Sequence, residues 1–127
     1  MKTRLFLHAA FIAAILAFAG IGCSKDKSTN GGPGGGTREF ASGDLSTGAS
    51  FSHTFSTAKV VNYYCRYHGG PGLQGMSGTI TVTATGTADQ FQVSISGSSL
   101  PTMTIPVGST VRWTNNHVQT HTVESDN

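Results

Sequence analysis

The feature that most restricts the fold is a series of short segments, starting near Phe40, in which apolar and polar residues alternate between Gly, Ser and Pro. Alternation with a period of two is typical of half-buried β-strands, and turn signals recur about every eight to twelve residues. This spacing favours an all-β sandwich or barrel. The pattern predicts strands at 49–55, 60–65, 77–84, 90–97, 102–107 and 110–115, with another beginning at 121–123.

The N-terminus has the pattern of an export signal over residues 1–22. Lys2 and Arg4 precede an apolar run that continues to Cys23. Gly22, Cys23 and the polar segment after them resemble the lipobox of bacterial lipoproteins, in which the cysteine is acylated. An uncleaved membrane anchor and a plain cleaved signal are the alternatives. We expect an exported lipoprotein, periplasmic or on the cell surface, anchored to the membrane through Cys23.

Residues 23–37 predict a flexible Gly-rich linker, because a Gly, Ser and charge-rich segment cannot bury apolar surface. One domain of about 90 residues, 38–127, remains. The formal net charge is +2, and Lys2 and Arg4 in the signal account for it. The other cations balance the acidic residues and are spread along the chain, so no nucleic-acid partner is expected.

The segment after residue 60 combines three soft or borderline metal ligands. Cys65 ends a predicted strand, His68 follows three residues later, and Met76 precedes the next strand. If Cys23 is lipidated, Cys65 is the only thiol left, which excludes an intramolecular disulfide. Thiolate and thioether suit copper(I), and imidazole suits both oxidation states. Two His and one Cys with a weak axial Met form the ligand set of blue-copper electron-transfer sites.

The sequence YYCRYHGGPGLQGMSGTITV, residues 63–82, resembles the copper loop and last strand of cupredoxins such as plastocyanin and pseudoazurin. Seven residues separate His68 from Met76, more than in small cupredoxins. The sequence IPVGSTVRWTNNHVQTHTV, residues 105–123, resembles the family segment that carries the second histidine ligand, here His121. In the family this segment lies in the N-terminal half, whereas here it lies at the C-terminus.

The resemblance implies a cupredoxin-like Greek-key β-sandwich of about seven to eight strands, circularly permuted. Residues 38–85 would be the family's C-terminal half and 90–127 its N-terminal half. It also implies one type 1 copper ion held by His121, Cys65, His68 and Met76. The implied function is that of a plastocyanin-like, blue-copper carrier of single electrons between redox protein partners, with copper storage or delivery as the alternative. A truncated tandem or a domain-swapped dimer would also explain the order of the halves.

Two other histidines are weaker candidates. His53 shares the parity of Phe51 and Phe55, so it is expected to pack in a strand. His117 lies four residues before His121 and is an alternative ligand. Four aromatic residues are expected in the core or on strand faces: Tyr63, Tyr64, Phe91 and Trp113. Arg66 and Tyr67 are expected in an exposed loop, where they could contact a redox partner.

An enzyme is not expected. Multicopper oxidases add His-x-His pairs, and this sequence contains none. A binuclear copper centre would need a second Cys in the loop after Cys65, where the sequence reads RYHGG. A purely structural β-domain is the remaining alternative.

Overall fold

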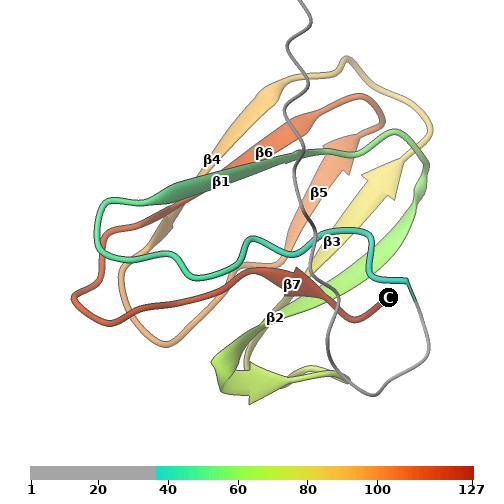
Figure 1. The fold of residues 1–127 in the computed structure, drawn as a ribbon. Helices are drawn as coiled ribbons and strands as arrows, with labels where there is room; N and C mark the ends of the chain where they lie inside the picture. Colours follow the sequence, from blue (N-terminus) through green and yellow to red (C-terminus); the bar gives the residue numbers. More distant parts are fainter. Residues whose placement is uncertain (1–36) are drawn as a thin grey trace, which may run out of the picture. The chain divides into compact units, whose positions relative to one another are not determined.

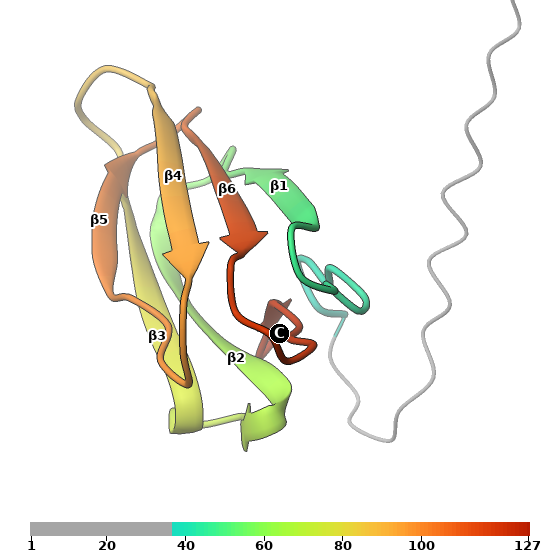
Figure 2. The same cartoon turned by 90° about the vertical axis from the view of Figure 1, so that its left-hand side faces the viewer.

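Two β-sheets face each other in the computed structural model, which describes residues 37–127 (Figures 1 and 2). One sheet has the strand order β1-β6-β4 and the other β5-β3-β2-β7. The strands are β1 (Ser50–Thr54), β2 (Lys59–Gly70), β3 (Gln74–Thr83), β4 (Gln90–Ile95), β5 (Met103–Pro106), β6 (Thr110–Asn115) and β7 (Glu124–Ser125). The predicted all-β class is confirmed. Within these residues no helix has the length and apolar character needed to cross a membrane.

The predicted signal, linker and lipidation site, residues 1–22, 23–37 and Cys23, lie outside the described residues, apart from position 37. These assignments therefore stay predictions.

Most predicted strands are present, with differences at their ends. β2 and β3 are longer than predicted, because pairing continues through Gly69↔Gly75 and Gly70↔Gln74 to a tight turn at 71–73. The strand expected at 121–123 begins later, at Glu124. His121 makes only an isolated bridge, to Leu45, since its partner segment is itself irregular.

The chain crosses between the sheets at every connection except the β2–β3 hairpin. As a result β4 pairs with β6 in parallel and β5 pairs with β3 in parallel, while the other pairs are antiparallel. β2, β4 and β6 all run toward the same end of the molecule. At that end the segment before β1 meets the β6–β7 connection through the bonds Leu45 N–H to His121 O and Thr47 Oγ1 to His117 O. The same connection meets β2 through the bond from the N–H of Thr122 to the Sγ of Cys65.

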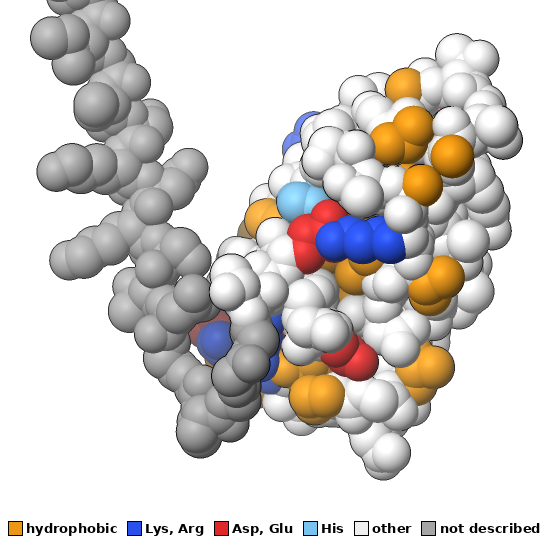
Figure 3. Space-filling view, turned by 90° about the vertical axis from the view of Figure 1, so that its right-hand side faces the viewer, with side chains coloured by type: hydrophobic (Ala, Val, Ile, Leu, Met, Phe, Trp, Pro, Cys, Tyr) orange, Lys and Arg blue, Asp and Glu red, His pale blue; other side chains and the backbone are white. Residues whose placement is uncertain are grey.

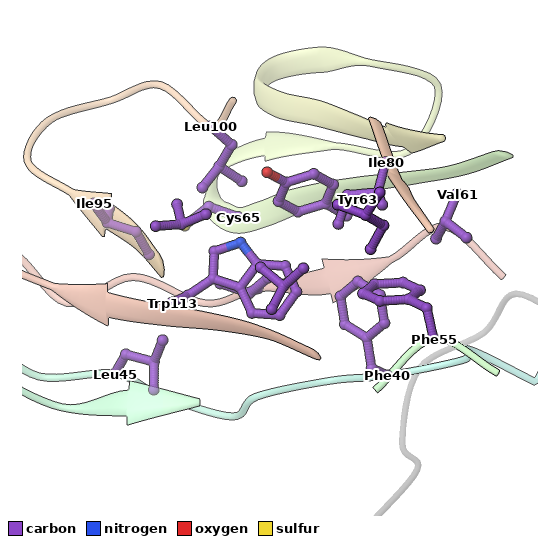
Figure 4. Packing of buried hydrophobic residues seen from close by; sticks show 14 of the residues in the cluster. Phe40, Leu45, Phe55, Val61, Tyr63, Cys65, Ile80, Ile95, Leu100 and Trp113 are labelled. Atoms are coloured by element: carbon purple, nitrogen blue, oxygen red, sulfur yellow. The ribbon is translucent and has the colours of Figure 1, made fainter. Parts of the chain in front are cut away.

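The core lies between the sheets and is built from the inward positions of each strand. Along β3 every second residue from Met76 to Val82 is buried, which is the period of two that the sequence contains. Figure 4 shows Trp113 near the middle of the cluster, with Tyr63 and Leu45 on opposite sides of it. Tyr63 donates its hydroxyl to the Pro101 carbonyl at 2.7 Å, and burial raises the pKa of Tyr63 to about 12.

His53 packs in a strand, as predicted. Its ring lies 4.9 Å from that of Phe40 and 4.8 Å from that of Phe55, measured between centroids. Its Nε2 is 3.4 Å from Glu39, whose other oxygen pairs with Lys59 at 2.8 Å. Figure 3 shows one face of the molecule, on which charged side chains form small mixed groups and hydrophobic side chains are scattered. On that face there is no broad patch of one charge.

Candidate metal centre

A bulge in β2 brings Cys65 and His68 together. The ladder with β3 pairs Tyr64 with Ser77 and next pairs Gly69 with Gly75, so residues 65–68 face the single residue Met76. Extra residues on one strand leave the ladder and bend the strand. The Sγ of Cys65 consequently lies 3.6 Å from Nδ1 of His68.

His121 reaches the same point from the β6–β7 connection. Its Nδ1 lies 3.6 Å from the Sγ of Cys65, although 56 positions separate the two residues. The three donor atoms all lie within 4.8 Å of one another. Metal–ligand bonds of about 2.0–2.3 Å place the S and N donors of one trigonal or tetrahedral ion about 3.6–3.8 Å apart. Cys65, His68 and His121 could therefore hold a metal ion.

The three side chains differ in exposure. Cys65 and His121 are fully buried, whereas His68 is half-buried and forms the outer edge of the group. Burial, together with the imidazoles of His68 and His117, lowers the pKa of His121. Because neutral imidazole is the form that binds a metal, this shift favours the binding form of His121.

Hydrogen bonds from backbone N–H groups to side-chain acceptors join the two ligand segments. The N–H of Thr122 donates to the Sγ of Cys65 at 3.4 Å, and the N–H of Arg66 donates to Oγ1 of Thr122 at 3.0 Å. The residues that follow each buried ligand thus hold the two segments in register.

Met76, the fourth predicted ligand, lies on β3 directly opposite the bulge. Its side chain is 1% exposed and belongs to the core cluster that also contains Cys65. Its role as an axial ligand stays a prediction.

His117, the alternative ligand in the sequence prediction, lies beside His121 and is not one of the three grouped residues. Its Nδ1 lies 3.0 Å from Nε2 of His121, the ring nitrogen that does not face Cys65. The group that the described residues form consists of Cys65, His68 and His121.

Arg66 and Tyr67 are both partly exposed, and both interact with other side chains of the same chain. Arg66 pairs with Asp44 and lies 3.4 Å from Glu124, and the hydroxyl of Tyr67 donates to Asp44 at 2.7 Å. Glu124 is buried and also pairs with Arg38. Sequence reasoning missed this network, because no spacing pattern links residues 38, 44, 66 and 124.

The hairpin beyond the bulge depends on Gly69. A Cβ at this position would lie 2.5 Å from the Gln74 carbonyl oxygen and 2.7 Å from that of Met76. Both are backbone atoms that cannot rotate away. A Cβ at the neighbouring Gly70 would meet nothing nearer than the Cβ of Gln74, at 4.0 Å.

We therefore expect Gly69→Ala to open the hairpin, displace His68 and weaken metal binding about 10- to 100-fold, the range seen when ligand orientation is lost. Titration of the full chain in detergent with Co(II), followed by thiolate absorption, measures this. Gly70→Ala is the matched control and should bind like the wild type. Equal affinities for the two variants would contradict the role assigned to Gly69.

Comparison with known proteins leaves the site to be interpreted from its own residues. No protein-family model, curated protein or solved structure matches this chain.

Proposed function

We propose that this protein is a blue-copper electron carrier that binds one copper ion through Cys65, His68 and His121. The observation that carries the proposal is the convergence of one thiol and two imidazoles at 3.6 Å spacing on a buried sulfur. Thiolate favours copper over hard cations, and imidazole serves both copper oxidation states. Met76, opposite the bulge, would supply a fourth, weaker thioether ligand.

The proposed fold is a circularly permuted cupredoxin, and the strand directions support it. β3 runs away from the metal centre, and β4 runs back toward it, as its parallel pairing with β6 requires. Residues 84–89 therefore need only reverse the chain direction between β3 and β4, at the end far from the metal centre. The termini of an unpermuted chain would lie at that end. A donor set assembled within one chain favours permutation over a domain-swapped dimer.

When bound, copper would supply the one-electron redox change. The protein's residues would keep the coordination of copper the same in both oxidation states. Cys65 and His121 exclude water by their burial, and the bonds from Thr122 and Arg66 fix the two ligand segments. His68 is the ligand nearest the surface, so its imidazole edge is the proposed point at which an electron passes to a docked redox protein. No substrate chemistry is required, and we propose no enzymatic activity.

We also propose that the domain works outside the cytoplasm. Residues 1–22 would direct export, acylated Cys23 would anchor the protein, and residues 23–37 would tether the domain to the membrane surface.

The experiment that tests the function is spectroscopy and electrochemistry on the copper-loaded full chain in detergent. A blue-copper carrier has an intense visible thiolate-to-copper band, a narrow copper hyperfine splitting in electron spin resonance and a reversible potential. A colourless protein that holds only copper(I) and exchanges it readily would be a storage or delivery protein instead. Failure to bind copper would leave a structural β-domain, and copper found only in dimers would indicate domain swapping.

A further inference from the structure

Both ring nitrogens of His121 have partners. Nδ1 faces the sulfur of Cys65 at 3.6 Å, while Nε2 lies 3.0 Å from Nδ1 of His117. A neutral imidazole carries its hydrogen on one nitrogen and leaves the other as an acceptor or ligand. If Nδ1 binds the metal, Nε2 carries the hydrogen and donates it to His117. This requires His117 to carry its own hydrogen on Nε2.

His117 is held in place by its own loop. Its backbone N–H donates to Oδ1 of Asn115 at 2.9 Å, and its carbonyl accepts from Oγ1 of Thr47 at 2.8 Å. The Nδ2 of Asn115 donates to the carbonyls of Leu45 and Gln119, both at 2.8 Å. Since Asn115 is fully buried, these bonds close the loop between β6 and His121. The closed loop sets the ring of His117 5.2 Å from that of His121.

We propose that His117 is a positioning residue of the metal centre, which accepts the Nε2 hydrogen of His121 and thereby keeps Nδ1 directed at Cys65. The inference rests on the proposed function. His117 is not a ligand in it, because its Nδ1 faces the edge of His121 that points away from the sulfur.

Two consequences follow from the chemistry of this bond. His121 is fully buried, so without His117 its Nε2 hydrogen would lose its partner, which is costly for a buried donor. An acceptor on the second nitrogen also raises the basicity of a ligating imidazole. A more basic ligand stabilises copper(II) relative to copper(I), so the bond to His117 would lower the reduction potential of a bound copper ion.

The test compares the full-chain wild type with His117→Phe, which keeps a ring but no acceptor, and His117→Gln, which can restore an acceptor oxygen. We expect His117→Phe to bind Cu(II) about 10- to 100-fold more weakly and to have a higher reduction potential. His117→Gln should restore most of the affinity and return the reduction potential toward the wild-type value. In the metal-free proteins, ¹⁵N NMR should show one tautomer of His121, with hydrogen on Nε2, in the wild type and a mixture in His117→Phe. His53→Phe, which replaces a histidine packed against Phe40 and Phe55, is the matched control and should change none of these values.

The outcomes separate the two proposals. A wild type that binds no copper overturns the proposed function, and the His121 tautomer then decides the role of His117 alone. A wild type that binds copper while His117→Phe matches it in affinity, potential and tautomer overturns only the positioning role. If His117→Gln fails as fully as His117→Phe, the acceptor is not what His117 contributes, and the inference is also overturned.

Discussion

The full chain with Cys65→Ser is expected to lose copper binding and the visible colour of the copper-loaded protein. The sulfur of Cys65 lies 3.6 Å from a nitrogen of each histidine, so it is the atom that both imidazoles share. Serine has nearly the same size, but its hydroxyl remains protonated and is a poor ligand for copper. We expect the affinity for Cu(II) to fall by more than the 10- to 100-fold typical of an orienting residue. Isothermal titration and absorption spectroscopy measure the two losses.

Cys23→Ser is the matched control for this variant. The chain has two cysteines, and Cys23 is the other one. Its replacement also changes one cysteine to serine but lies outside the proposed ligand set, so the protein should still bind one copper ion and remain coloured. Unchanged near-ultraviolet circular dichroism of Cys65→Ser would show that the core around the site is intact. A Cys65→Ser variant with wild-type affinity and colour would refute the proposed ligand set.

The largest effect on stability is expected from Trp113→Ala. The fully buried indole of Trp113 lies on β6, and its ring centroid is 5.8 Å from that of Tyr63 on β2, so it joins the two sheets. It also packs 5.6 Å from Phe40 and 5.9 Å from Phe51. Removal of a buried Trp costs about 3–5 kcal/mol. In a domain of this size the melting temperature should fall by roughly 12–40 °C.

Thermal unfolding of the metal-free proteins, followed by far-ultraviolet circular dichroism, tests this effect. Val118→Ala alters a side chain that is 85% exposed and should change the stability by less than about 0.5 kcal/mol. Trp113→Phe retains an aromatic ring between the sheets and should fall between the two. A Trp113→Ala variant within about 1 kcal/mol of the wild type would mean that the core can collapse into the space, contrary to the packing in Figure 4.

Much of the fold could be predicted, because the period of two in β-strands is local. Thr110–Asn115 forms a strand where the alternation predicts one, and its inward positions include Val111 and Trp113. Strand ends were predicted less well. The Gly-rich segment around Pro71 reads as a loop, yet pairing of Gly69 with Gly75 extends both strands through it. Pairing of two segments is decided by their partners and is not visible in either segment alone.

The candidate site, like the fold, could be predicted from the sequence only in part. The spacing of Cys65 and His68, together with the family resemblance that pointed to His121, could be recognised in the residues, and the β-class follows from the alternation. Only the tertiary structure decided that a bulge in β2 and the β6–β7 connection meet, that the second nitrogen of His121 faces His117, and that Glu124 is buried beside Arg38 and Arg66. The reason is physical: residue type and spacing determine which local structures and ligands are available, whereas contacts between segments far apart in the chain arise from the packing of the two sheets.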